Sequence, residues 1–299
     1  MKDRINQLKK EKDAVILAHY YVLDEVQEIA DYVGDSFYLS KIAKEIDAEK
    51  IVFCGVSFMG ESAALLNPKK KVLMPDKDAD CAMAHMADIQ KIKELRNTYE
   101  DLAVVCYINS TAELKAYSDV CVTSANALNV VRNLPNKNIY FIPDGNLGQY
   151  VKEQVPEKNV ILNEGYCPIH AAMTKEEVQE SKKLHPNAKF LVHPECTREV
   201  LAEADYIGST SGIINYVAKD DAQEYIIGTE IGVLYELVKQ NPNKQFFTLR
   251  KPPICTDMKK ITLEKVLNVL EKENNVVTVS KEISEKALLP LEKMLMLAK

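Results

Sequence analysis

Short apolar runs alternate with longer amphipathic segments along the whole chain. Runs such as "AVILAHY" from residue 14 and "AVVCYIN" from residue 103 have the length and composition of buried strands. Segments 3–12, 88–100 and 174–185 are polar, with apolar residues at helical spacing. Buried strands separated by such helices are typical of parallel sheets covered on both faces. The pattern predicts an α/β fold.

The pattern occurs three times, with a period of about 87 residues. The phrase "ADYVGDS" at residues 30–36 returns as "ADYIGST" at residues 204–210, and "SDVCVTS" at residues 118–124 stands between them. Every copy also ends in a cysteine, which gives the set Cys81, Cys167 and Cys255. Successive members of this set are 86 and 88 residues apart, so the repeat keeps its register over the whole chain.

Three equivalent αβα subdomains with parallel sheets are most economically arranged about a pseudo-threefold axis. Right-handed crossovers place the carboxyl ends of all strands at one edge of each sheet, where ligands bind, so we expect the active site at the centre. We expect residues 1–83 together with 258–299 to form the first subdomain, 84–170 the second and 171–257 the third. Residues 258–299, which include a predicted strand at 276–280, are expected to pack back onto the first subdomain.

The three repeated cysteines are candidate metal ligands. If they converge, their thiolates repel one another unless a cation neutralises them. Structural zinc usually takes four ligands, whereas an iron-sulfur cluster can use three cysteines and leave one iron open. The sequence contains no CxxC pair, which weakens the zinc interpretation. Cys54, Cys106 and Cys121 lie in apolar strands and are expected in the core, whereas Cys196 remains a rival ligand.

Polar and ring-bearing residues follow the first strand of each copy, at the edge where ligands bind. These candidates are His19, Tyr20, Tyr21, Tyr107, Asn109, His193 and Glu195. We take His19, Asn109 and His193 as the same position in the three copies. Side chains alternate along a strand, so only one of Tyr20 and Tyr21 is expected to face the site.

A hydroxyl follows the second strand of each copy, at Ser36, Ser124 and Thr210. Each is placed to cap the next helix. Three converging helix N-termini present free N–H groups to an anion, and no Lys or Arg lies beside these hydroxyls. His170 is expected near a ligand cysteine, with His85 and His185 at the surface.

The bulk composition limits the classes of function. The chain has 299 residues, is 46% hydrophobic and carries a formal net charge of -6, which argues against nucleic acid as the main partner. No apolar run approaches the ~18 residues that a membrane span needs, and the polar N-terminus is not a signal peptide. We therefore expect a cytoplasmic protein without a membrane partner. Disulfides are rare in that compartment.

At these residues the chain resembles quinolinate synthase, the iron-sulfur enzyme of de novo NAD (pyridine nucleotide) biosynthesis. The similar stretches cover nearly the whole chain: "LAHYY", "EVQEIADYVGDS", "CYINSTAELKAYSD", "TSANA", "HPEC", "ADYIGSTSG", "IGTEIG" and "MKKITLEKV". The resemblance implies a transferase that condenses iminoaspartate with dihydroxyacetone phosphate and releases phosphate and two waters. It also implies a functional link to an enzyme that produces iminoaspartate.

The resemblance further implies a metal-binding site with a 4Fe-4S cluster on Cys81, Cys167 and Cys255, whose open iron acts as a Lewis acid. It implies substrate contacts at His19, Ser36, Tyr107, Asn109, Ser124, His193, Glu195 and Thr210. For acid-base catalysis we select Tyr21, Tyr107, Glu195 and His193. The segment "PPICTDMKK" has a single cysteine, which argues against a disulfide switch there.

Three alternatives remain open from the residues alone. The first is another hydro-lyase that uses an open iron on a different acid. The second is a binding module that grips a small anion without chemistry. The third is a scaffold that holds zinc.

Overall fold

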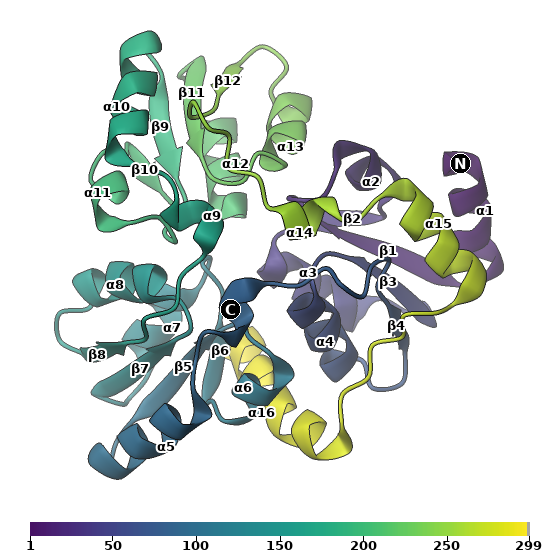
Figure 1. Ribbon diagram of the computed structural model, residues 1–299, viewed down its shortest axis with the longest axis horizontal. Helices are drawn as coiled ribbons and strands as arrows, with labels where there is room; N and C mark the ends of the chain where they lie inside the picture. The colour runs from purple at the N-terminus through teal and green to yellow at the C-terminus, as the bar shows by residue number, and fades with distance from the viewer. Residues whose placement is uncertain (298–299) are drawn as a thin grey trace.

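The computed structural model of the chain, described for residues 1–297, contains three α/β units around a common centre (Figure 1). Each unit has one four-stranded sheet in which all strands are parallel, which confirms the predicted fold class. The strand orders are β2-β1-β3-β4, β6-β5-β7-β8 and β10-β9-β11-β12. The three sheets therefore share one topology, as the sequence repeat requires.

The strands are short and mostly buried, as expected for sheets covered by helices. The first unit contains β1 (Ala14–His19), β2 (Tyr32–Gly34), β3 (Lys50–Cys54) and β4 (Lys71–Leu73). The second contains β5 (Ala103–Tyr107), β6 (Val120–Val122), β7 (Asn138–Ile142) and β8 (Asn159–Leu162). The third contains β9 (Lys189–Val192), β10 (Tyr206–Ile207), β11 (Glu224–Gly228) and β12 (Gln245–Phe247).

The helices follow the same order in each unit. The first unit has α1 (Lys2–Glu11), α2 (Asp24–Ile29), α3 (Ser36–Glu45), α4 (Ser57–Leu66) and the 3-10 helix η1 (Ala82–His85). The second has α5 (Ile89–Thr98), α6 (Ala112–Ala116), α7 (Ala127–Asn133), α8 (Gly145–Gln154) and α9 (Pro168–Ala171). The third has α10 (Lys175–Leu184), α11 (Arg198–Leu201), α12 (Thr210–Lys219), α13 (Val233–Gln240) and α14 (Thr256–Lys259). Two further helices follow, α15 (Leu263–Lys272) and α16 (Lys281–Leu297).

The aspartate of the recurring phrase has the same structural role in all three units. Its carboxylate accepts a hydrogen bond from the backbone of the unit's first strand. The contacts are Ile16 N to Asp31 Oδ2 at 2.8 Å, Val104 N to Asp119 Oδ2 at 2.7 Å and Phe190 N to Asp205 Oδ2 at 2.7 Å. This bond fixes where the second strand begins beside the first, so the phrase is needed once in every unit.

A cation from the first helix of each unit pairs with the same aspartate. The pairs are Lys9 with Asp31 at 2.7 Å, Arg96 with Asp119 at 2.9 Å and Lys182 with Asp205 at 4.0 Å. Each of these cations also donates to a backbone carbonyl close before the aspartate. The helix, the turn and the strand are thus joined at one point in every unit.

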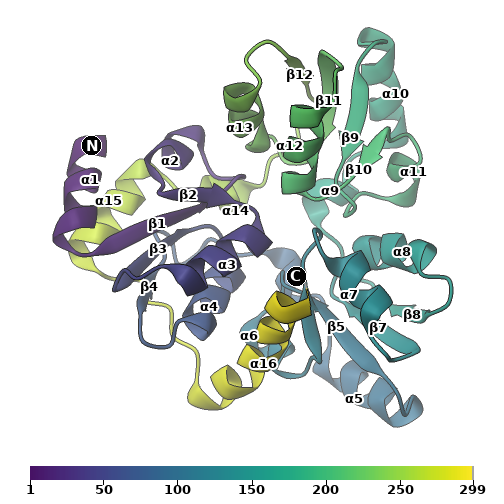
Figure 2. The same cartoon turned by 180° about the vertical axis from the view of Figure 1, so that it is seen from behind.

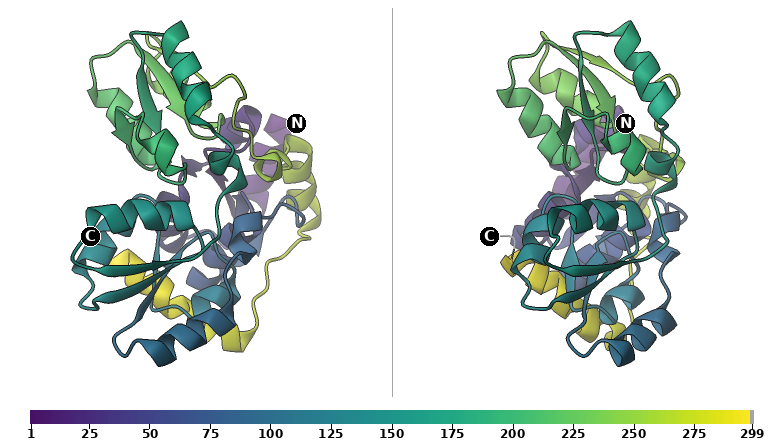
Figure 3. Two further views of the ribbon diagram at one scale, coloured as in Figure 1. Left: turned by 60° about the vertical axis from the view of Figure 1, so that its left-hand side comes forward. Right: turned by 90° about the vertical axis from the view of Figure 1, so that its left-hand side faces the viewer.

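The C-terminal segment departs from the expected packing. α15 contacts α1 and β3 of the first unit, but α16 contacts α6 and β6 of the second unit and α4 of the first. Figure 2 shows α16 between these two units, and Figure 3 shows the long connection from α15 that leads to it. Of the predicted return, 258–299, the described residues 258–297 therefore do not pack on the first unit alone, because α16 buries its apolar face across the boundary between the two, and 298–299 lie outside the described residues. The exact subdomain boundaries remain a prediction.

The predicted strand at 276–280 was also wrong. Val276 makes only an isolated antiparallel bridge to Leu73, and no strand forms there. The apolar run is instead part of the connection to α16, and Val277 and Val279 pack against the large core of the first two units. Within residues 1–297, no helix combines the length and the apolar character that a bilayer crossing requires.

Candidate active site and metal centre

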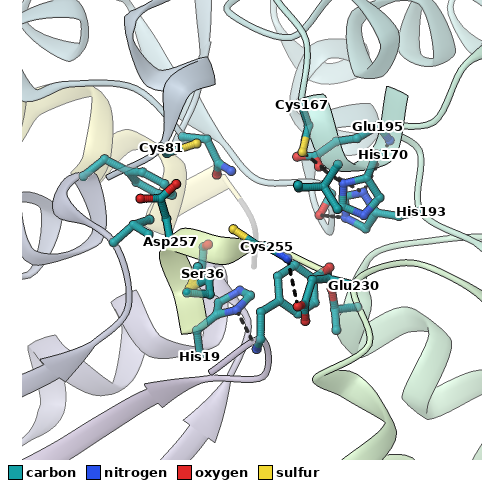
Figure 4. A pocket seen from close by; sticks show the side chains of 18 of the residues that line it. His19, Ser36, Cys81, Cys167, His170, His193, Glu195, Glu230, Cys255 and Asp257 are labelled. Atoms are coloured by element: carbon teal, nitrogen blue, oxygen red, sulfur yellow. Dashed lines mark hydrogen bonds and ion pairs between the residues drawn. The ribbon is translucent and has the colours of Figure 1, made fainter. Parts of the chain in front are cut away.

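A cavity lies where the three units meet, and all three contribute to its walls (Figure 4). It is reached by the carboxyl ends of the first strands and the N-termini of the helices that follow the second strands. Its lining includes His19, Tyr21, Ser36, Cys81, Tyr107, Asn109, Ser124, Cys167, His193, Glu195, Thr210 and Cys255. The structure thus brings every predicted site residue to one cavity.

The three repeated cysteines occupy equivalent backbone positions at this cavity. Cys81, Cys167 and Cys255 are the N-cap residues of the short helices η1, α9 and α14. Their sulfur atoms face the cavity from three sides (Figure 4). Burial raises the pKa of all three thiols, that of Cys81 to about 12, so without a cation the cavity favours the neutral thiols.

The donor set of the cavity fits an iron-sulfur cluster better than a zinc ion. One group within reach of a single ion consists of Cys167, His170 and Glu195, whose ligand atoms lie within 4.8 Å of one another. However, His170 Nδ1 is 2.7 Å from Glu195 Oε2, a hydrogen-bond distance, whereas neighbouring ligands of tetrahedral zinc are about 3.3 Å apart. Those two groups satisfy each other. Three cysteines outside any disulfide line the cavity, which matches a cluster held by three cysteines.

The rival ligand Cys196 lies away from the cavity. It is fully buried, and its sulfur contacts Met173 Sδ at 3.9 Å and the Gly228 carbonyl oxygen at 3.8 Å. Cys54, Cys106 and Cys121 are also fully buried in strands, as predicted. The cavity therefore selects the three repeated cysteines from the seven in the chain.

Glu195 is a buried carboxylate that lies beside two imidazoles and a tyrosine. It is 3% exposed, and burial alone would raise its pKa, but His193, His170 and Tyr107 together hold the pKa at about 2. His170 Nδ1 lies 2.7 Å and His193 Nδ1 3.6 Å from Glu195 Oε2. At neutral pH Glu195 is therefore an anion that can accept a proton inside the cavity.

A chain of hydrogen bonds connects Glu195 with Tyr21. Thr229 Oγ1 lies 2.9 Å from His170 Nε2 and 2.7 Å from the Tyr21 hydroxyl, which is itself 2.7 Å from Thr210 Oγ1. An ionised carboxylate only accepts, so the Nδ1 proton of His170 is donated to Glu195. When the Nδ1 proton is the only one on the ring, Nε2 accepts from Thr229, which in turn accepts from Tyr21. This series of hydrogen bonds thus lets Glu195 orient the Tyr21 hydroxyl without touching it.

The other imidazoles and amides are positioned by their neighbours. Burial lowers the pKa of both His19 and His193 to about 3, so both are neutral at physiological pH. His193 Nε2 is 3.1 Å from Ser124 Oγ. Among the described residues, the buried Asn109 Oδ1 has no hydrogen-bond partner. A buried acceptor of this kind is paired in most proteins, so it is available to a ligand.

The strand contacts correct the assumed equivalence of His19, Asn109 and His193. The strand residue that each aspartate binds gives a common starting point for counting along the chain. Three residues beyond it lie His19, Tyr107 and His193, which are therefore the equivalent positions. Two residues further along, the equivalent positions are Tyr21, Asn109 and Glu195. The Tyr21 N–H donates to His19 Nδ1 at 3.1 Å, and the Glu195 N–H lies at 3.3 Å from His193 Nδ1 in the same way. The sequence alignment was wrong by two residues in the second copy.

The predicted capping by Ser36, Ser124 and Thr210 was also wrong. Asp35 and Ser209 cap α3 and α12, because an N-cap residue lies just outside the first helical residue. Asn126 takes the N-cap position of α7. Released from capping, the three hydroxyls line the cavity and are available to a ligand.

The remaining candidates are placed clearly. Tyr21 lines the cavity, whereas Tyr20 packs against a core cluster of the third unit. His170 is 3.2 Å from Cys167 Sγ, next to a candidate ligand as expected. His85 lies outside and contacts Asp80, and His185 stacks on Phe247.

Sequence reasoning missed Thr229, Glu230 and Lys259. Glu230 is fully buried, lines the cavity and pairs with Lys259 at 2.9 Å. A charged residue inside the apolar stretch "YIIGTEIGVLY" is the signal that could have found it, because buried carboxylates need partners. Thr229 carried no comparable signal.

The fold and the site define an α/β enzyme whose central cavity is shared by three parallel-sheet units and lined by three cysteines. A family model described as "Quinolinate synthetase A protein" matches residues 3–296. The chain belongs to this family.

Named relatives cover the chain almost completely. It is 56% identical to "Quinolinate synthase" of Fusobacterium nucleatum, over all of this chain (100%) and 99% of that protein. The identity to the "Quinolinate synthase" of Caldicellulosiruptor bescii is 52%, with 99% of this chain and 97% of that one covered. That of Clostridioides difficile is also 52% identical, over 95% of this chain and 94% of the relative.

Proposed function

We propose that the chain condenses iminoaspartate with dihydroxyacetone phosphate to give quinolinate, phosphate and two waters, as a transferase of pyridine nucleotide biosynthesis. The observation that carries this proposal is the meeting of three equivalent cysteines and a set of acid-base groups in one cavity. Cys81, Cys167 and Cys255 would hold a 4Fe-4S cluster. When bound, the cluster would supply an open iron as a Lewis acid, without a redox change.

The residues around the cluster suit the proton transfers of a condensation. Glu195 is the ionised base, and Tyr107, whose pKa burial raises, is the adjacent hydroxyl that remains protonated. Tyr21 is the second acid-base hydroxyl, and it is held in place by the series of hydrogen bonds that runs through Thr229 and His170. These groups would remove a proton next to a carbonyl and return protons to leaving hydroxyl groups.

The substrate anions would bind to neutral donors. α3 and α12 begin at Ser36 and Thr210, which line the cavity, so unpaired N–H groups of their first turns would serve as donors to an anion. Ser124 and neutral His193 add donors from the second and third units. Enclosure by all three units would keep water away from a hydrolysable imine, which fits a substrate delivered by an iminoaspartate-producing enzyme.

The test is anaerobic purification followed by iron, sulfide and visible-absorption measurements. The wild type is compared with Cys81→Ala, Cys167→Ala and Cys255→Ala, and turnover is assayed with iminoaspartate and dihydroxyacetone phosphate. Each cysteine variant is expected to lose the cluster absorption and the activity. Iron-loaded wild type that fails on both substrates would support another hydro-lyase, and zinc without iron would support the scaffold alternative.

A further inference from the structure

A buried ion pair beside the third cysteine is not used by the chemistry described above. Glu230 and Lys259 form it, with Lys259 Nζ 2.9 Å from Glu230 Oε1. Glu230 is fully buried and the Lys259 side chain is 19% exposed. Burying two charges costs free energy that good geometry only partly returns, so stability alone is a weak explanation for the pair.

The glutamate holds the loop that carries Cys255. Glu230 Oε1 accepts a hydrogen bond from the Cys255 backbone N–H at 3.1 Å, a contact drawn in Figure 4. Its other oxygen, Oε2, accepts from the Gly232 N–H at 2.7 Å. One carboxylate thus fixes both the ligand loop before α14 and the turn after β11.

The lysine reaches in the other direction, to the loop that carries Tyr21. Lys259 Nζ donates to the Tyr21 carbonyl oxygen at 2.6 Å. The same loop is held from its other side by Gln27, whose Nε2 donates to the carbonyl oxygens of Tyr20 at 2.8 Å and Gly232 at 3.0 Å. Lys259 itself lies in α14, the helix that Cys255 caps.

Gly232 allows the two loops to meet. A Cβ atom at this position would lie 2.6 Å from the Tyr20 carbonyl oxygen and 2.8 Å from the Tyr21 Cα atom, both of which are backbone. Any side chain would therefore push the Tyr20–Tyr21 loop away. The first and third units are joined at this point by backbone contact as well as by the hydrogen bond from Lys259 to the Tyr21 carbonyl oxygen.

We propose that Glu230, Lys259 and Gly232 form a latch that couples cluster binding at Cys255 to the position of Tyr21. A cluster that pulls Cys255 into place also places α14, and with it Lys259. Lys259 then draws the Tyr21 loop against Gly232. Glu230 and Lys259 are positioning residues, since they act through Cys255 and Tyr21. The inference rests on the proposed cluster and adds that its loss loosens the first unit's catalytic loop.

The test is amide hydrogen exchange of the Tyr20–Val22 segment in cluster-loaded and cluster-free protein. These amides are bonded to the Gly34 carbonyl oxygen, His19 Nδ1 and the His19 carbonyl oxygen, so they are protected while the loop is docked. In the wild type, anaerobic removal of the cluster is expected to speed their exchange by at least about tenfold, which corresponds to about 1.4 kcal/mol. Loaded Lys259→Met is expected to exchange as fast as the cluster-free wild type.

Two further variants and a control separate the latch from general damage. Glu230→Gln and Gly232→Ala break the latch from its other side and are expected to speed the same exchange. The matched control combines Glu236→Gln with Lys239→Met, a pair in α13 at 3.6 Å, and should behave like the wild type. Melting temperatures measured on cluster-free protein show whether each variant folds.

Two results would overturn the latch. One is equal exchange of the segment in loaded and cluster-free wild type, and the other is wild-type protection in loaded Lys259→Met. A variant that folds when cluster-free but no longer retains iron supports the latch, because Cys255 is then misplaced. Wild-type protein that binds no iron would refute the proposed function itself, and the latch with it.

Discussion

Thr229 offers a sharp test of the hydrogen-bond chain that ends at Tyr21. Its hydroxyl is fully buried and contacts the Tyr21 hydroxyl at 2.7 Å and His170 Nε2 at 2.9 Å. Thr229→Val keeps the shape of the side chain but removes this hydroxyl. Tyr21 then keeps only Thr210, while His170 Nε2 is left unpaired in a buried position.

The expected cost follows from that unpaired atom. A buried acceptor without a partner costs about 1–3 kcal/mol, so the free energy of unfolding should fall by this amount. If the same interaction is lost in the transition state, kcat falls between about 5-fold and about 150-fold. Thr229 does not line the cavity, so KM should change much less than kcat.

The measurement is steady-state kinetics of anaerobic, iron-loaded protein, together with urea unfolding. Thr229→Ser is the matched control, because it keeps the hydroxyl and loses only a methyl group. It should retain kcat within a few-fold. A Thr229→Val variant with wild-type kcat, or a Thr229→Ser variant with a lower kcat than Thr229→Val, would show that these hydrogen bonds do not orient Tyr21.

Three more outcomes are expected. Cys196→Ala should keep the wild-type iron content and visible absorption, since this sulfur lies away from the cavity; loss of iron would make it a ligand. Asp119→Ala should lower the free energy of unfolding by about 1–3 kcal/mol more than Asp119→Asn, because asparagine keeps an acceptor for the strand N–H. Equal free energies of unfolding in urea titrations would show that the bond from Asp119 to the strand does not contribute. Gly145→Ala should lower the melting temperature, because its Cβ would lie 2.4 Å from the Asn163 carbonyl oxygen, and an unchanged value would contradict this contact.

The repeat made most of the fold predictable from the sequence. A period that survives in the apolar runs, the aspartates and the cysteines implies three copies of one topology, and parallel strands imply a shared ligand edge. The ligand-like character of Cys81, Cys167 and Cys255 follows from that geometry alone. The packing of α16 did not follow, because its amphipathic pattern shows that one face is buried but not which unit covers it.

The details of the site depended on contacts between residues far apart in the chain. Thr229 meets Tyr21 and His170 only after all three units assemble, so no local spacing reveals it. Helix starts were placed one residue too late at Ser36 and Thr210 and two residues too early at Ser124, which is why Ser36 was taken for a cap and Asp35 was not. An error of that size changes which oxygen is free to bind a ligand.

The divergence of the three copies separates what the metal centre needs from what the substrate needs. In every unit, the residue before the short helix η1, α9 or α14 is a cysteine, as three equivalent ligands of one metal centre would require. Two positions at the end of the first strand and just beyond it differ between the units: His19, Tyr107 and His193 at one, and Tyr21, Asn109 and Glu195 at the other. A substrate without threefold symmetry meets a different group from each unit, so selection on binding and catalysis acts differently on the three copies. The scaffold stays symmetric where the aspartates and cysteines are, and becomes asymmetric where the proposed reaction would use an acid, a base and an amide on different sides of one molecule.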